Sequence, residues 1–157
     1  MAASPIPEGY HSVNHYLSVD DAAQAIDFYT RAFGASERMR MQSPDGKIAH
    51  AEIEIGDSIV MLSDPMPQSG MKPPKELGGT TAGAMLYVED VDAVVQSAVD
   101  AGAEITMPID DMFWGDRYGR VVDPFGHDWA VATHVEDVQP DQMAERAKEA
   151  MAAMGSS

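Results

Sequence analysis

The feature that most constrains the fold of this chain is an internal repeat. The stretch YLSVDDAAQAIDFYTRAFGASE, which starts at Tyr16, matches MLYVEDVDAVVQSAVDAGAE, which starts at Met85. Each copy reads as a strand, an aspartate suited to cap a helix, an amphipathic helix and a glycine suited to end it. The repeat therefore predicts two copies of one structural unit.

Three further strands are expected after each helix. The turn-forming sequences SPDGK, IGDS and DPFGH separate the apolar runs. The sequence thus predicts an α+β fold of two βαβββ modules. We expect an N-terminal extension over 1–12, a first module over 13–63, a loop over 64–80, a second module over 81–134 and a C-terminal amphipathic helix and tail over 135–157.

Composition excludes several classes of function. The 157 residues include 26 acidic and 10 basic side chains, for a formal net charge of -16, and no cysteine. Disulfides, zinc–thiolate sites and thiol nucleophiles are therefore excluded. Such an acidic protein repels nucleic acid and anionic lipid. With no apolar run long enough for a membrane span and no signal-peptide pattern, we expect a cytoplasmic protein without nucleic-acid or membrane partners.

Two βαβββ units opened by SVDDAAQAIDFYTRAFGA and closed by DPFGHDW resemble the vicinal oxygen chelate superfamily. That superfamily includes glyoxalase I, bleomycin-resistance proteins, extradiol dioxygenases and fosfomycin-resistance enzymes. The stretches HAEIEIGDSIVMLSD and WGDRYGRVVDPFGHDW resemble its PhnB-like branch. The resemblance covers about 13–134 and implies curved sheets around a cavity, helices on the convex side and a homodimer. It does not fix a reaction, because the superfamily includes both enzymes and plain binders.

The resemblance also implies where metal-dependent members place their ligands, on the first and last strands of each module. Counted from the helix-capping aspartates, these positions fall on Asn14, Met61, Gly83 and Ala130. Asparagine is a weak oxygen ligand, and the other three cannot hold a hard divalent ion. We therefore expect no metal cofactor at the usual positions.

Strand alternation suggests what lines the cavity instead. Residues on the face away from the helices are apolar, aromatic or weakly polar, and they suit a small organic ligand. The same residues could equally fill a core. The candidates on this face are Asn14, Tyr16, Met61, Met85 and Tyr87.

A second candidate site lies in the stretch HAEIE. Alternation places His50 and Glu52 on one face of a strand, where they suit a base and its orienting carboxylate. They are the candidate catalytic residues of an alternative function, a metal-dependent lyase, isomerase or dioxygenase-type enzyme with a relocated Zn, Ni, Mn or Fe ion. A strand face that is polar only because it is exposed to solvent would show the same sequence pattern.

The stretch GDRYGRVVDPFGHDW divides into a scaffold and a candidate pocket rim. DPFGH is expected to be a turn and Trp129 a core residue. Asp116, Arg117 and Tyr118 have no evident structural duty, so they are candidate ligand-binding residues. Asp116 and Arg117 could pair with each other or with the other module, or Arg117 could bind a ligand carboxylate. Trp114, expected at the pocket edge, could stack on a ligand. The first hypothesis is a small-molecule binder, the second is the enzyme, and the third is an interaction protein that works through its C-terminal helix.

Overall fold

The computed structural model describes residues 3–155. Its first half contains β1 (His15–Ser18), α1 (Ala22–Phe33), β2 (Ser36–Gln42), β3 (Ile48–Ile55) and β4 (Ser58–Ser63). A short helix α2 (Pro74–Leu77) follows in the connecting loop. The second half contains β5 (Gly83–Tyr87), α3 (Val91–Ala101), β6 (Glu104–Asp111), β7 (Asp116–Val122), β8 (Asp128–His134) and the C-terminal helix α4 (Pro140–Met154).

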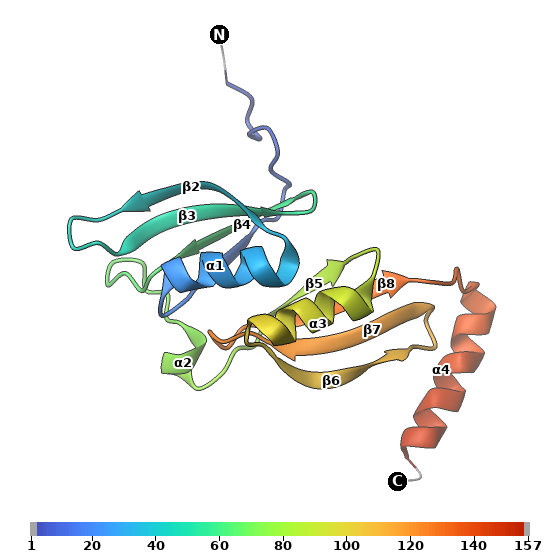
Figure 1. Ribbon diagram of the computed structural model, residues 1–157. Coiled ribbons are helices and arrows are strands. Elements are labelled where there is room, and N and C mark those ends of the chain that lie inside the picture. Colours follow the sequence, from blue (N-terminus) through green and yellow to red (C-terminus); the bar gives the residue numbers. More distant parts are fainter. Residues whose placement is uncertain (1–2, 156–157) are drawn as a thin grey trace.

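The two halves have the same topology, as the repeat predicts. The first sheet has the strand order β1-β4-β3-β2 and the second has β5-β8-β7-β6. In each sheet the first strand of the module pairs in parallel with the last, and the other pairs are antiparallel. The α+β fold of two βαβββ modules and a C-terminal helix is thus confirmed (Figure 1). The loop over 64–80 contains helix α2, which the sequence pattern did not indicate.

Both main helices begin and end on the expected residues. The side chain of Asp21 accepts a hydrogen bond from Gln24 N, and that of Asp90 accepts one from Ala93 N. Each carboxylate thereby satisfies a backbone donor that the first helical turn leaves free. Gly34 and Gly102 then adopt left-handed backbone angles, with φ of 68° and 119°, and end the helices.

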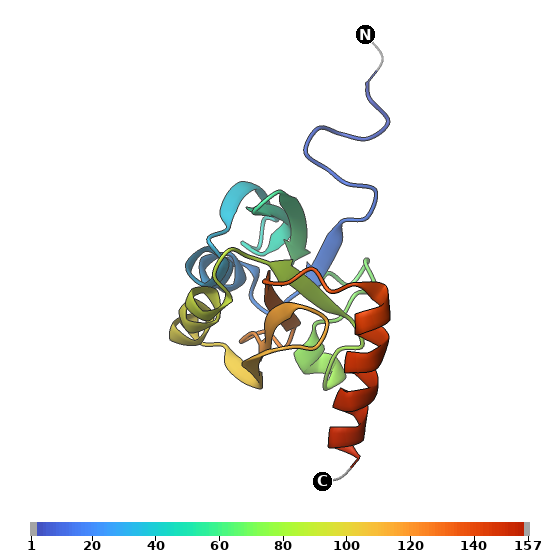
Figure 2. The same cartoon turned by 90° about the vertical axis from the view of Figure 1, so that its right-hand side faces the viewer.

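The helices α1 and α3 lie side by side on one side of the two sheets, and they form the main junction of the modules (Figures 1 and 2). Leu17, Ile53, Leu62, Val121 and Val131 are buried on the helix side of the sheets. One continuous cluster of buried apolar residues spans both modules. The two repeats are therefore held together by a shared core rather than by the loop alone.

The DPFGH turn of the second module inserts into this shared core. The carboxylate of Asp123, only 4% exposed, accepts four hydrogen bonds. Two come from the backbone amides of its own turn, and two come from Tyr29 Oη on α1 and Trp129 Nε1 on β8. His127 of the same turn is hydrogen-bonded to the carbonyl of Ser18 at 2.8 Å. The expected turn is confirmed, and it also clamps the second module onto the first.

The opposite faces of the two sheets carry no helix. Strand alternation places Tyr16, His50 and Glu52 on this face of the first sheet, and Met85 and Tyr87 on that of the second. Tyr87 is 61% exposed and Met85 is 45% exposed, so within one chain these faces are open. We call them the open faces below. The sequence pattern predicts that these residues line an enclosed cavity. The structure differs because the alternation of side chains along a strand defines a face but does not determine what covers that face.

The C-terminal helix α4 projects beyond the second sheet (Figures 1 and 2). It contains no buried residue, and Met151 and Met154 are largely exposed. Arg146 anchors its middle through a double hydrogen bond to Glu136 in the preceding segment. Among residues 3–155, no helix has the length and apolar character needed to cross a membrane.

Candidate functional site

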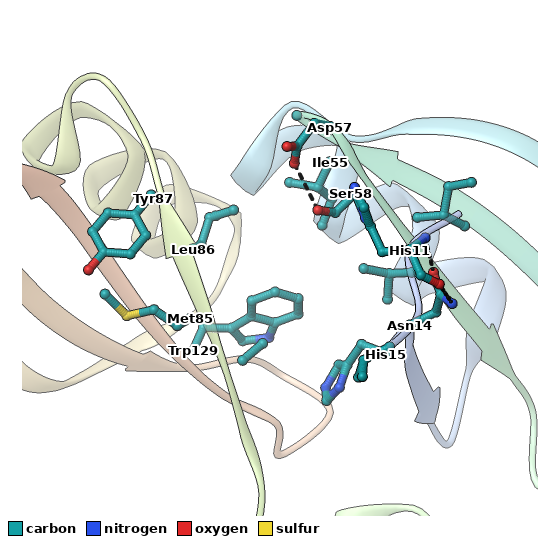
Figure 3. Close-up of a pocket in the computed structure, with 15 residues that line it drawn as sticks. His11, Asn14, His15, Ile55, Asp57, Ser58, Met85, Leu86, Tyr87 and Trp129 are labelled. Carbon is teal, nitrogen blue, oxygen red and sulfur yellow. Dashed lines mark hydrogen bonds between the residues drawn. The ribbon is translucent and has the colours of Figure 1, made fainter. Parts of the chain in front are cut away.

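A cavity with a volume of about 520 Å³ lies between the β1 edge of the first sheet and β5 of the second. Figure 3 shows His11, Asn14 and His15 on one side of it, facing Met85, Leu86, Tyr87 and Trp129 on the other. Ile55, Ser58, Ile59 and Val60 close the first-module side. We call this space the inter-sheet cavity. Its walls are mainly apolar and aromatic, with a few polar groups among them.

The polar groups of the inter-sheet cavity are few and partly engaged. Asn14 holds a local turn, because its amide accepts from His11 N at 3.1 Å and donates to His11 O at 2.6 Å. Burial lowers the pKa of His15, which favours its neutral form at neutral pH. A neutral imidazole can either donate or accept a hydrogen bond. The cavity therefore presents orienting polar groups, among them a His15 imidazole whose neutral form is favoured.

On the open face of the first sheet, three side chains form a hydrogen-bonded chain. Tyr16 Oη lies 3.1 Å from His50 Nδ1, and His50 Nε2 lies 3.3 Å from Glu52 Oε1. Because a carboxylate accepts, Nε2 carries the proton in this arrangement and Nδ1 accepts from the tyrosine. The expected pairing of His50 with Glu52 is thus present in the geometry. Tyr16 reaches His50 from β1, across the intervening strand β4.

The surroundings of Glu52 favour its ionised form. The hydroxyl of Tyr10 lowers the pKa of the Glu52 carboxyl, and contact with His50 adds to this effect against the opposing influence of burial. The guanidinium of Arg38, which lies over the Tyr10 ring at 5.6 Å, also contributes. An ionised carboxylate accepts a hydrogen bond from Nε2 and thereby fixes the orientation of the His50 imidazole. Both ring nitrogens of His50 are therefore engaged, one by Tyr16 and one by Glu52.

On the second sheet, Asp116 is the centre of a comparable polar cluster. It is 3% exposed, and Oδ2 accepts from Tyr87 Oη and Trp114 Nε1, both at 2.9 Å. His134 Nδ1 lies 2.8 Å from Oδ1 of the same carboxylate. Burial alone would raise the pKa of Asp116, but the three hydrogen bonds together hold it below its usual value. Asp116, Tyr87 and Trp114 are thus brought together, as neighbours that position one another.

Arg117 points to the helix side of β7. Its guanidinium makes a double hydrogen bond to Asp92 of α3 and a third bond to Asp111 of β6. These carboxylates raise its pKa, with Asp92 contributing most. Arg117 therefore ties the strand to the helix, and its donors are largely engaged.

Arg120, three residues later, lies on the open face instead. Sequence reasoning overlooked it, although alternation along β7 contains the signal. Residues 116, 118 and 120 share one face, whereas 117 points away. Tyr118 stays on the open face with Arg120, and its ring meets that of Trp114 edge-on at 5.5 Å.

The five residues that alternation predicted to line the cavity fall into two groups. Asn14, Met85 and Tyr87 line the inter-sheet cavity. Tyr16 and Met61 belong to the open face of the first sheet, where Met61 pairs with both Tyr16 and Glu52 across the strands. His15 and Leu86 line the inter-sheet cavity without having been singled out.

The positions where the resemblance implies metal ligands are occupied by Asn14, Met61, Gly83 and Ala130. The Asn14 amide is engaged by the backbone of His11, and the other three side chains offer no hard oxygen or nitrogen donor. No group of three or more His, Asp or Glu side chains suited to a metal ion occurs within residues 3–155. These residues do not fit a divalent metal ion.

This fold and this cavity define a class of proteins built from two βαβββ modules with a cavity between their sheets. The model of the Glyoxalase/Bleomycin resistance protein/Dioxygenase superfamily matches residues 12–131. The chain belongs to this superfamily, which the sequence motifs indicated under its other name, vicinal oxygen chelate.

Similar proteins agree with this assignment. The uncharacterized protein Rv0887c of Mycobacterium tuberculosis is 47% identical over 135 residues, which is 84% of this chain and 79% of that protein. The protein YjdN of Escherichia coli is 32% identical over 153 residues, covering 81% of this chain and 97% of YjdN. The crystal structure of TioX from Micromonospora sp. ML1 matches with a TM-score of 0.61 and 31% identity, covering 79% of this chain and 100% of TioX.

A PhnB protein from Bacillus cereus shares the fold with a TM-score of 0.61, at 17% identity over 78% of this chain and 99% of that one. At this identity the likeness concerns the fold alone.

Proposed function

We propose that this protein binds a small organic molecule in the inter-sheet cavity. The observation that carries the proposal is the cavity itself, with a volume of about 520 Å³ and walls formed by Met85, Leu86, Tyr87 and Trp129. Ligand sites of globular proteins have volumes of roughly 300–1,000 Å³, and most are apolar with a few polar groups that orient the ligand. Asn14, His15 and Ser58 supply such groups here.

We further propose that this binding needs no metal ion. The residues at the four implied ligand positions supply one amide, which the His11 backbone already uses. A hard divalent ion needs several oxygen or nitrogen donors arranged around it. A ligand in this cavity would instead be held by shape, apolar contact and hydrogen bonds.

A fragment screen by NMR tests the proposal. We expect neutral aromatic and aliphatic fragments to shift the amide signals of residues 83–87 and 55–60. The variant Ser58→Tyr places a phenol at the cavity wall and should weaken this binding at least about tenfold. The matched control Gln96→Tyr adds the same group on the exposed surface of α3 and should leave binding unchanged. Equal binding by the parent protein and Ser58→Tyr would refute this location.

The alternative enzyme function is favoured by one observation, the hydrogen-bonded chain of Tyr16, His50 and Glu52. With a divalent ion bound near His50, such a cluster would suit a lyase, isomerase or dioxygenase-type reaction. Metal analysis after incubation with Ni, Zn, Mn or Fe(II) distinguishes the two functions. One equivalent that is lost in His50→Ala would support the enzyme, whereas less than about 0.1 equivalent would support the binder.

We also propose that the protein is a homodimer whose interface covers the open faces. Large exposed apolar side chains gather there on both sheets, and an apolar surface of this kind is typical of an interface. They include Met39, Met41, Met85, Tyr87 and Met107. Light scattering should give twice the chain mass, and Met41→Asp combined with Met107→Asp should give a monomer. If removal of residues after Val138 alone gave a monomer, α4 would be the interface.

A further inference from the structure

A second cavity, of about 330 Å³, lies on the open face of the second sheet. It is lined by Met85 of β5, Tyr118 and Arg120 of β7, and Asp128 and Ala130 of β8. Ala84 and Met85 line both this cavity and the inter-sheet cavity, so the two adjoin at β5. We call the smaller space the Arg120 cavity.

The register of the sheet creates this space around the guanidinium. Arg120 is paired with Ala130 on one side and with Met107 on the other. Ala130 is in turn paired with Met85 of β5. Because alanine is short, it leaves a hollow between the long side chains of Arg120 and Met85. The walls of the hollow are a thioether, a phenol ring and a methyl group, with one cation at the side.

Arg120 is also only weakly engaged by carboxylates. Its nearest carboxylate, Asp128, lies 3.8 Å away, beyond hydrogen-bond distance. Arg31, Arg40, Arg117 and Arg146 each contact a carboxylate at 2.9 Å or less. Within the described part of the chain, Arg120 thus combines three properties: a cavity, an apolar wall and free guanidinium donors. In a chain of net charge -16, few such donors are left to a ligand.

These features select one class of ligand. A guanidinium binds a carboxylate through two parallel hydrogen bonds, in a geometry that lysine cannot copy. The cavity offers one cation, and the nearby Asp128 carboxylate repels a dianion such as a phosphate monoester more strongly than a monocarboxylate. The Met85 thioether and the Tyr118 ring suit a flat apolar body.

We propose that Arg120 holds the carboxylate of a small aromatic acid whose ring lies against Met85 and Tyr118. The inference deepens the proposed function by naming the class of organic ligand, and it rests on that function.

The test compares benzoate with its neutral amide, benzamide, by NMR titration of the full chain. We expect benzoate to shift amide signals over residues 83–87, 118–122 and 128–132, and to bind at least about tenfold more tightly than benzamide. Arg120→Gln should reduce benzoate affinity at least about tenfold, and Arg120→Lys should restore only part of it. The matched control Arg31→Gln, on the exposed surface of α1, should bind benzoate like the parent.

The variant spectra also report whether the fold is intact, so a loss of binding is not confused with unfolding. Equal benzoate affinity in Arg120→Gln and the parent would overturn the inference, as would equal affinity for benzoate and benzamide. If both probes bound alike at residues 55–60 and 83–87, organic-ligand binding would stand and only the carboxylate assignment would fail. If benzoate did not bind while the neutral fragments did, organic-ligand binding would again stand and only the carboxylate assignment would fail.

Discussion

The two modules share a backbone plan but differ in what their open faces carry. Both have an aspartate N-cap, a left-handed glycine at the helix end and the same strand order. The first open face presents the Tyr16–His50–Glu52 chain, whereas the second presents Arg120 beside Tyr118 and a buried Asp116. The repeat thus preserves caps and core, while the open faces have diverged into an acid–base cluster and a cationic hollow.

Two turns show the same contrast at smaller scale. SPDGK joins β2 to β3, and DPFGH joins β7 to β8. Ser43 and Asp123 start the two turns, and each donates its amide to the residue four positions later at 2.9 Å. The first turn is largely exposed, whereas the carboxylate of Asp123 is buried against α1 and β8. The two turns share this backbone hydrogen bond, but the SPDGK turn only connects its own two strands, whereas the DPFGH turn also joins the two modules.

The largest expected effect follows from removing Asp123. Asp123→Ala leaves the buried Tyr29 hydroxyl, the Trp129 indole and two backbone amides without their acceptor, at a cost of roughly 4 kcal/mol of unfolding free energy. Ser43→Ala in the exposed turn should cost about 1 kcal/mol or less. Urea denaturation of both variants measures the difference. Equal losses would mean that the buried turn does not clamp the modules.

The glycines of the two turns provide the next test. Gly46 and Gly126 have φ of +84° and +90°, so alanine is strained at both, at roughly 1–2 kcal/mol. A Cβ at Gly126 would also lie 2.8 Å from Pro74 Cβ, whereas nothing lies within 4 Å at Gly46. Gly126→Ala should therefore cost about 1–3 kcal/mol more than Gly46→Ala. Thermal or urea unfolding of the two variants measures this difference. Equal losses of unfolding free energy would contradict the packing of α2 against the DPFGH turn.

Removing the N-cap of either main helix should destabilise the two modules by similar amounts. Asp21→Ala and Asp90→Ala each remove one capping hydrogen bond of 3.0 Å, and each should cost about 1 kcal/mol of unfolding free energy. Two losses within about 0.5 kcal/mol of each other would confirm that the caps are equivalent. A difference of several-fold would mean that one helix depends on its cap and the other on packing.

The smallest effect concerns pH. Hydrogen bonds to Asp116 and, secondarily, Asp137 raise the pKa of His134 above its ordinary value. Because the folded-state pKa is raised, the stabilisation is complete below the unfolded-state value of about 6.5 and is lost as pH rises through the folded value. NMR titration of the imidazole should give a pKa above that of a free histidine. Asp137→Asn should lower it, and an unchanged pKa in this variant would exclude the contact.

Much of the fold could be predicted from local patterns. The caps at Asp21 and Asp90, the DPFGH turn and the helix over 140–154 depend on residues close in sequence, so spacing was enough to place them. The bond from Tyr29 to Asp123 joins residues far apart in the chain, and no local pattern contains it. For the same reason the sequence did not indicate that the open faces are exposed within one chain.

The candidate site was predicted less completely. Alternation brought His50 and Glu52 together correctly, because both lie on one strand. Arg117 drew attention as a charged residue in a dense motif, yet its partners Asp92 and Asp111 lie on other elements. To predict the role of Arg120, two facts must be combined: the alternation of side chains along β7, and the small size of Ala130, its partner on the neighbouring strand β8. Such cross-strand hollows are a property of register, which a single sequence specifies only indirectly.

The central claim is that the inter-sheet cavity binds an organic molecule without a metal ion. The most direct measurement is the dissociation constant of a neutral fragment bound there, taken after dialysis against a chelator and again with added Ni, Zn, Mn or Fe(II). We predict values that agree within about twofold under all conditions, in both the parent and His50→Ala. Binding that appears only with a metal ion and disappears in His50→Ala would contradict the claim and establish a metal-dependent site at His50 and Glu52.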